Sequence, residues 1–198
     1  MTIAQHIFTD RSALILVDVQ RAFLEWENAG KRRNNPNALA NVTALLDAYR
    51  RAGLPIYHIR HSAQEVGSAL RAELPGFSPI EGVEERDGEP VLIKHVNSSF
   101  IGTDLEVRLR DMGTTKLVIA GITTNHCVET TTRMAGNLGF DAFLVGDACY
   151  TFDRTGYDGQ IERAEDIHAI TLSNLNGEFA TITTTEKVLS GLNRADAA

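Results

Sequence analysis

The sequence predicts an α/β fold of three layers, with helices on both faces of a six-stranded, mostly parallel sheet. Apolar runs without polar alternation are typical of strands buried on both faces, and here they alternate with runs of helical periodicity. The predicted strands are 13–17, 55–59, 90–94, 117–120, 140–145 and 177–182. No internal repeat or linker divides the chain, so we expect one domain over residues 1–198.

Composition and charge exclude several classes of protein. Hydrophobic residues make up 43% and charged residues 23%, as in ordinary soluble globular domains. The net charge of −7 argues against a nucleic-acid partner, and no apolar run approaches the ~20 residues of a membrane span. Two cysteines without a C-x-x-C motif fit a reducing compartment, and no signal peptide is evident. We therefore expect a cytoplasmic protein with a small-molecule partner, no nucleic acid and no membrane.

In the first half of the chain, two buried strands end beside polar side chains. The run 13–17 ends at Asp18, and the run 55–59 leads into His61. Between these strands the sequence predicts a loop with Phe23 and Trp26, a solvated basic run at 31–33, and a helix that begins at Pro36 after an Asn35 cap and stops near Gly53.

The middle of the chain contains a long connection, 62–90, of the length often found in lids and excursions. It includes a predicted short helix at 68–73. The strand that follows ends at Lys94, and Thr103 with Glu106 forms a predicted capping box for the next helix. Further on, helices are predicted at 128–138, 161–175 and 185–189.

The stretch 116–135 combines a strand, a sharp turn and a helix. Gly121 is expected to break the strand, and 123–125 are helix-start residues. Cys127 therefore falls in the first turn of a helix, where unpaired N–H groups and the helix dipole favour a thiolate. Cys127 is a candidate nucleophile, and the alternative is a small buried core residue.

Three chemically complementary side chains follow strands of the predicted sheet. Ligand and catalytic sites form beyond the carboxyl ends of parallel strands, which is where Asp18, Lys94 and Cys127 fall. Cys127 can attack an sp² carbon, Asp18 can take and return its proton, and Lys94 can hold Asp18 ionised. Individually, Asp18 could cap a turn and Lys94 could be a solvated charge.

Other residues near these strand ends are candidates for contact with substrate, with core packing or surface exposure as the alternative. His126, next to Cys127, is interpreted as structural, because adjacent helix positions do not face each other. The candidate pocket residues are Gln20, Phe23, Trp26, His61, Asn97 and Phe100, with Tyr150 and Phe152 as further candidates.

Four motifs carry a resemblance to a known family. In chain order they read LILVDVQ, VLIKHVNSSFIGTDLE, AGITTNHCVETTTRMA and LGFDAFLVGDACYTFDR. Together they resemble the isochorismatase-like cysteine hydrolases, which include nicotinamidases, N-carbamoylsarcosine amidases, and ureidoacrylate and biuret amidohydrolases. The resemblance covers about 12–182 and implies a six-stranded parallel sheet between helices.

The resemblance also implies roles for individual residues. The catalytic triad would be Asp18, Lys94 and Cys127, and the backbone N–H groups of Thr123 and Cys127 would form the oxyanion hole. The peptide bond before Thr123 is usually cis in this family. Relatives are often dimers or tetramers, so a homo-oligomer is expected.

Two features narrow the expected chemistry. The metal-binding Asp-x-His of family nicotinamidases is replaced by Ile59-Arg60-His61, so we expect no metal, no cofactor and a substrate other than nicotinamide. The presence of Cys127 favours hydrolysis of a C–N bond in a small amide, ureide or lactam through an acyl-thioester. The alternatives are vinyl-ether hydrolysis of isochorismate and a catalytically silent binding or scaffold protein. A dinucleotide-binding domain is disfavoured because no G-x-G-x-x-G follows the first strand.

Overall fold

A computed structural model of the protein describes residues 8 and 11–193. Its main sheet has the strand order β3-β2-β1-β4-β5-β8, and every neighbouring pair is parallel. This confirms the predicted six-stranded parallel sheet. The strands are β1 (Ser12–Val17), β2 (Ile56–His61), β3 (Val91–Lys94), β4 (Lys116–Ile122), β5 (Asp141–Tyr150) and β8 (Thr181–Thr183).

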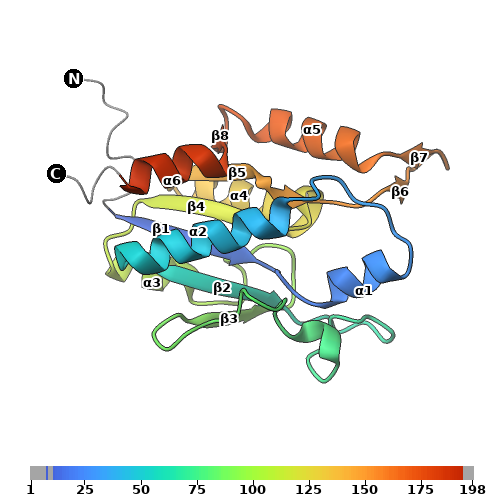
Figure 1. Ribbon diagram of the computed structural model, residues 1–198, viewed down its shortest axis with the longest axis horizontal. Helices are drawn as coiled ribbons and strands as arrows, with labels where there is room; N and C mark the ends of the chain where they lie inside the picture. The colour runs from blue at the N-terminus through green and yellow to red at the C-terminus, as the bar shows by residue number, and fades with distance from the viewer. Residues whose placement is uncertain (1–7, 9–10, 194–198) are drawn as a thin grey trace.

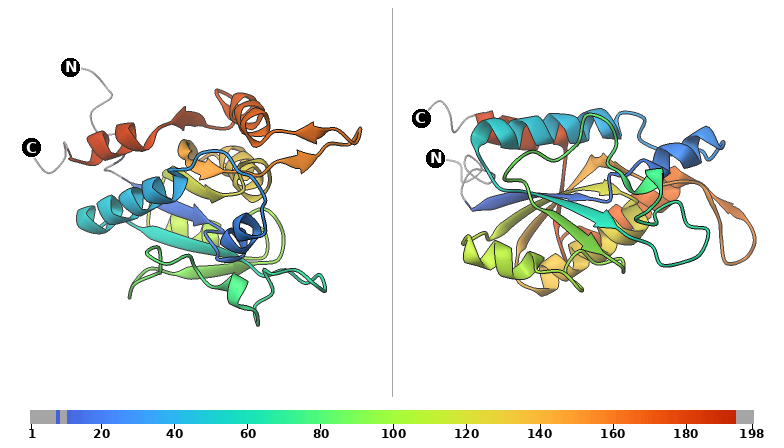
Figure 2. Two further views of the ribbon diagram at one scale, coloured as in Figure 1. Left: turned by 45° about the vertical axis from the view of Figure 1, so that its right-hand side comes forward. Right: turned by 90° about the horizontal axis from the view of Figure 1, so that it is seen from below.

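Helices cover both faces of the sheet. In the right-hand view of Figure 2, α2 (Ala38–Ala52) and α6 (Thr185–Asn193) lie above the sheet, and α3 (Leu105–Asp111) and α4 (Glu129–Asn137) lie below it. The helix α5 (Ala164–Leu175) contributes Leu175 to the same core as α3 and α4. In Figure 1, α1 (Ala22–Asn28) and the small hairpin β6 (Arg154–Thr155) and β7 (Ile161–Glu162) lie at one end of the sheet.

The two cores explain why β1 has no polar alternation. All six of its residues are buried. Leu14 and Leu16 pack into the core under α2 and α6, whereas Ala13, Ile15 and Val17 pack into the core under α3 and α4. A strand covered on both faces reads as a continuous apolar run.

The strand order creates a crevice between β1 and β4. From β1 the chain builds outward through β2 and β3, and it then returns to the other side of β1 to build β4, β5 and β8. In doubly wound sheets, ligands bind where the strand order reverses, beyond the carboxyl ends of the strands. The residues that follow β1 and β4 therefore face this crevice.

The structure adds one helix that the sequence did not predict and corrects the starts of two others. The predicted loop with Phe23 and Trp26 is the helix α1, too short for its periodicity to show in the sequence. Helix α2 begins at Ala38, because the Asn35 amide instead donates to the carbonyls of Cys149 and Gly146. Helix α3 begins at Leu105 after Asp104, whose side chain makes no cap; the Thr103 hydroxyl donates to the Ser99 carbonyl and accepts from the Leu105 N–H at 3.4 Å.

The structure also extends the two central strands beyond their predicted ends. Gly121 does not break β4: it remains in the strand, where a Cβ atom would lie 2.0 Å from the Val17 carbonyl oxygen. Strand β5 continues through an irregularity in its pairing with β4 and ends at Tyr150. Within it, Asp147 accepts hydrogen bonds from the backbone N–H and hydroxyl of Thr185 at the start of α6.

The remaining corrections concern connecting segments. In the long connection, 68–73 forms turns rather than a helix, and a 3₁₀ turn, η2, occupies Pro75–Phe77. The helix predicted from 161 begins at Ala164, because Ile161 and Glu162 pair with β6. The last strand is confined to β8, after a turn at 177–179. Among the described residues, no helix is long and apolar enough to cross a membrane.

Candidate functional site

Asp18 and Lys94 form a buried ion pair at the carboxyl end of the sheet. Asp18 directly follows β1 in a left-handed backbone conformation, with φ of 52°, which Asp tolerates better than most residues. Its Oδ2 lies 2.7 Å from Nζ of Lys94, the last residue of β3, and both side chains are essentially inaccessible to solvent. Asp18 Oδ1 is also buried and has no hydrogen-bond partner among the described residues.

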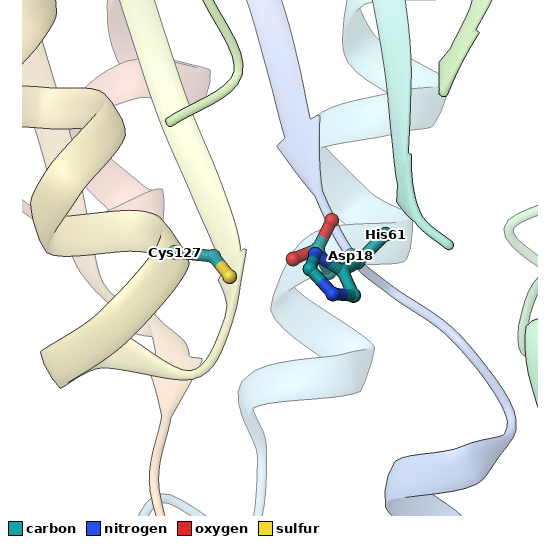
Figure 3. A group of neighbouring side chains, drawn as sticks. All are labelled: Asp18, His61 and Cys127. Carbon is teal, nitrogen blue, oxygen red and sulfur yellow. The ribbon is translucent and has the colours of Figure 1, made fainter. Parts of the chain in front are cut away.

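Cys127 lies in a tight turn between β4 and α4. The turn is a π-helical segment, η3 (Thr124–Val128), and the Thr123 carbonyl accepts hydrogen bonds from the N–H groups of His126 and Val128. The Ile122–Thr123 peptide bond is cis, as the family resemblance predicts. Figure 3 shows the sulfur of Cys127 directed toward Asp18 and His61. One polar atom of each of these three side chains lies within 4.8 Å of the other two.

The protonation state of Cys127 differs from the sequence-based expectation. The pKa of the thiol is raised to about 12, first by burial and then by the nearby Asp18 carboxylate, with the charge of Lys94 acting in the opposite direction. The enclosed position beside a carboxylate outweighs the helix terminus, which alone would favour a thiolate. Cys127 therefore rests as a thiol and needs a base, and the Asp18 carboxylate, which has an oxygen within 4.8 Å of the sulfur, is next to it.

His61 extends the buried polar cluster. Its Nδ1 lies 3.4 Å from Lys94 Nζ, and because an ammonium group has no acceptor, Nδ1 must accept and the ring proton resides on Nε2. Burial lowers the pKa of His61, and the charge of Lys94 lowers it further, so the ring is neutral near neutral pH. The Nε2–H group is thus the donor that His61 can offer.

A cavity of about 520 Å³ opens above this cluster. Two predicted pocket residues, Phe23 and Trp26, form part of its wall with ring centroids 5.0 Å apart, and Phe152 packs against Trp26. The cavity is lined by Asp18, Phe23, Trp26, Lys31, His61, Leu70, Asn97, Thr123, Asn125, His126, Cys127, Thr151, Phe152, Asp153 and Arg154.

The structure does not bring two of the predicted pocket residues to this cavity. Gln20 is fully buried, and its side-chain amide is bonded to the backbone of His61: the oxygen accepts from the His61 N–H, and the nitrogen donates to the His61 carbonyl. The same nitrogen also donates to the Phe77 carbonyl. Phe100 turns into the core and stacks on Phe140, with centroids 6.0 Å apart. Gln20 therefore positions His61, and Phe100 packs beneath α3 and α4. Tyr150, a further candidate, is also buried outside the lining.

Several lining residues were not identified from the sequence. Leu70 comes from the long connection, Asn125 from the cysteine turn, and Thr151, Asp153 and Arg154 from the segment after β5. Lys31 was interpreted as part of a solvated loop. An isolated bridge between Arg33 and Phe152 joins that loop to the segment after β5. No local pattern in the sequence predicts this long-range pairing.

The residues present do not fit the metal site of the family's nicotinamidases. At the corresponding place, Arg60 pairs with Glu85 and His58 pairs with Glu89, so these side chains already have partners. Among the described residues, Asp18, His61 and Cys127 are the one group with ligand atoms close enough to share an ion. However, the ammonium of Lys94 lies against both Asp18 and His61, where its charge opposes a second cation. The cluster therefore suits proton transfer better than metal coordination.

Comparison with known proteins agrees with the fold. The model of the isochorismatase domain matches residues 12–187. The chain belongs to the isochorismatase family. It is 42% identical to YrdC, an uncharacterized family protein from Bacillus subtilis, over 91% of this chain and 96% of that protein. A solved structure of a family protein from Chromobacterium violaceum is 41% identical, with a TM-score of 0.90, over 98% of this chain and 99% of the other.

More distant relatives of this isochorismatase-family chain have names that specify chemistry. Nicotinamidase 3 from Arabidopsis thaliana is 28% identical over 91% of this chain and 88% of that protein. The structure of a cysteine hydrolase from Pseudomonas syringae is 26% identical, with a TM-score of 0.85, over 93% of each chain. These relationships support a hydrolase that acts on amide bonds.

Proposed function

We propose that this protein is a cysteine-dependent amidohydrolase that cleaves a C–N bond of a small amide, ureide or lactam. One observation carries the proposal: the two oxygens of the Asp18 carboxylate have different surroundings. Oδ2 is neutralised by Lys94 at 2.7 Å, whereas Oδ1 is buried and has no hydrogen-bond partner in the described part of the chain. One oxygen of this carboxylate lies within 4.8 Å of the Cys127 sulfur. This arrangement suits a base that takes a proton only when the thiol attacks.

The first half of the proposed reaction forms an acyl-thioester. The carbonyl carbon of the substrate enters above Cys127, the S–C bond forms, and the thiol proton passes to Asp18. The backbone N–H groups of Thr123 and Cys127 stabilise the negative charge that develops on the carbonyl oxygen. The C–N bond then breaks as Asp18 returns the proton to the leaving nitrogen, which departs as ammonia or an amine.

The second half hydrolyses the thioester. A water molecule takes the place of the leaving group, and Asp18 accepts its proton as the oxygen attacks the acyl carbon. The S–C bond breaks, the proton returns to Cys127, and the acid leaves. Lys94 remains charged throughout and keeps Asp18 ionised between the two steps.

A matched pair of cysteine variants tests the proposal. Small amides, ureides and lactams are screened for release of ammonia or amine, using wild type, Cys127→Ala and Cys149→Ala. Cys149 is buried in β5 outside the cavity, so its variant controls for the loss of a thiol. We expect Cys127→Ala to abolish turnover and Cys149→Ala to retain it.

The same variants separate the alternatives. Vinyl-ether hydrolysis of isochorismate needs no acyl-thioester, so a Cys127→Ala protein that retains most activity on isochorismate would favour that reaction. A binding or scaffold role predicts an inert cysteine and no turnover of any compound. Full activity of Cys127→Ala on an amide would rule out the proposed mechanism.

A further inference from the structure

Two cations of the cavity lining lack a direct carboxylate partner. Of the two lining carboxylates, Asp18 is paired with Lys94, and Asp153 accepts from Arg32 Nε at 3.0 Å. The lining cations Lys31 and Arg154 have no carboxylate within 4.0 Å among the residues that the structure describes. Arg154 is in register with Glu162 across β6 and β7, but the two side chains form no ion pair.

The basic run 31–33 shows that Lys31 differs from its neighbours. Arg32 binds both Asp153 and Glu165, and Arg33 binds Glu27. Lys31 instead lies over the ring of Trp26, with Nζ 4.2 Å from the ring centroid. This cation–π contact holds the ammonium group at the aromatic wall without neutralising it.

The backbone brings the segments that carry the two cations side by side. Residues 31–34 run antiparallel to 151–154: the Asn34 N–H donates to the Thr151 carbonyl, and the Asp153 N–H donates to the Arg32 carbonyl. Lys31 and Arg154 belong to the same end of this pairing, and both line the cavity.

Arg154 is held close to the nucleophile. Its Nη1 lies 3.2 Å from Nε2 of His126, the residue beside Cys127. Because Arg only donates, His126 Nε2 accepts, and the Nδ1–H group points to the Thr123 hydroxyl at 3.3 Å. Burial lowers the pKa of His126, and the charge of Arg154 lowers it further, so the neutral ring fixes the guanidinium without adding a second charge.

We infer that Lys31 and Arg154 form a carboxylate-binding subsite, so that the amide cleaved at Cys127 belongs to an anionic substrate. This inference rests on the proposed function. The substrate class is the half-amide or ureido derivative of a small acid, with its carboxylate at the cavity mouth and its scissile carbonyl over Cys127. The aromatic wall of Phe23, Trp26 and Phe152 contacts the carbon atoms between these two groups.

Two alkylating reagents that differ in charge test the subsite without knowledge of the substrate. Iodoacetate and iodoacetamide react alike: the Cys127 sulfur bonds to the methylene carbon, iodide leaves, and the thiol proton is released. The ratio of their rates is measured at Cys127 by mass spectrometry and divided by the same ratio for free cysteine. We expect wild type to favour iodoacetate by about tenfold, the size of one charge-assisted contact.

The controls use the charge of single side chains. Lys31→Gln and Arg154→Gln should each lower the normalised ratio, the double variant should bring it to about one, and added salt should lower it in wild type. Lys116→Gln removes the same charge at the start of β4, the opposite end of the strand from the cavity, and should leave the ratio unchanged. A wild-type ratio near one, or a ratio unaffected by the double variant, would overturn the inference.

Turnover distinguishes failure of the subsite from failure of the proposed function. We expect succinamate to be hydrolysed with a KM about tenfold below that of succinamide, and the double variant to remove this difference. Hydrolysis of both with equal KM overturns the subsite and leaves the amidohydrolase intact. If neither compound is hydrolysed, nor any amide of the screen, the proposed function fails, and the subsite is judged by whether succinate, but not succinamide, raises the unfolding temperature of wild type and not of the double variant.

Discussion

The floor and the mouth of the cavity are built in opposite ways. The floor consists of Asp18, Lys94 and His61, which are buried or half-buried, joined by hydrogen bonds and placed by strand ends. The mouth carries Lys31 and Arg154, which are exposed; Lys31 comes from a loop and Arg154 begins β6, and a short antiparallel pairing joins their segments. Charges at the floor act in a low dielectric and those at the mouth act close to water.

The difference indicates that the floor and the mouth have separate functions, in chemistry and in ligand binding. At the floor, burial together with the Asp18 carboxylate raises the pKa of the Cys127 thiol to about 12, against the opposing charge of Lys94. Exposed cations contribute little to folding but can attract and orient a charged ligand. Substitutions at the floor should therefore affect chemistry and stability strongly, and substitutions at the mouth should affect substrate choice.

The largest expected effect is that of Asp18→Asn. Loss of the base should reduce kcat by at least about 10³-fold, within the range of general acid–base catalysis. The pKa of Cys127 should nevertheless fall below about 12, because the carboxylate that raises it is gone while the opposing charge of Lys94 remains. Thiolate absorbance against pH measures the pKa, and ammonia release measures kcat.

This prediction separates a base from a thiolate-stabilising partner. If the reaction needed only a thiolate, Asp18→Asn would be as active as wild type or more so. A variant with lower pKa but no turnover is the expected result. A Cys127 pKa that rises in this variant would contradict the electrostatic account of the floor.

Lys94→Met should have the next largest effect, through stability. It leaves the buried Asp18 carboxylate without its partner, which typically costs ~3–5 kcal/mol of unfolding free energy. Asp18→Asn in the same chain removes this unpaired buried charge, so the double variant should be more stable than Lys94→Met alone. Urea unfolding of the four proteins gives the coupling. The exposed pair of Asp104 and Arg108 is the control, and Arg108→Met should change stability little.

The contrast between floor and mouth also explains what the sequence could predict. Asp18, Lys94 and Cys127 follow buried strands, and the position of strand ends in a parallel sheet is a general rule, so their meeting could be expected. Arg154 and Lys31 come to one cavity because their segments pair although they are distant in the chain, and no local pattern encodes this pairing. The pKa of Cys127 was mispredicted for a related reason: the local helix start was visible, but the burial of the thiol beside Asp18 is tertiary.

Gly121→Ala should have a smaller effect, on the backbone that holds the floor. A Cβ atom at Gly121 would lie 2.0 Å from the Val17 carbonyl oxygen, where β4 and β1 run side by side, and the residue has φ of 139°. Forced displacement and an unfavourable backbone conformation together should cost roughly 3 kcal/mol. Gly113→Ala is the matched control, since Gly113 has φ of 66° but open space around its Cβ position.

The difference between the two glycine variants isolates the close approach of the strands. Thermal unfolding should show a clearly larger loss for Gly121→Ala than for Gly113→Ala, and Gly121→Ala should also lose activity because Val17 directly precedes Asp18. Equal losses in the two variants would mean that backbone conformation alone requires glycine at 121.

The smallest expected effect is at His126, where the floor meets the mouth. His126 accepts from Arg154 and points its Nδ1–H group at the Thr123 hydroxyl, so neither ring nitrogen is available as a base for Cys127. Gln can make both hydrogen bonds, and His126→Gln should retain kcat within a few-fold. His126→Ala frees Arg154 and should raise the KM for succinamate by a few-fold, with kcat changed less than about tenfold. If both variants instead lose more than about 100-fold in kcat, the range expected for removal of a general base, then His126 takes part in the chemistry and the division between floor and mouth is wrong.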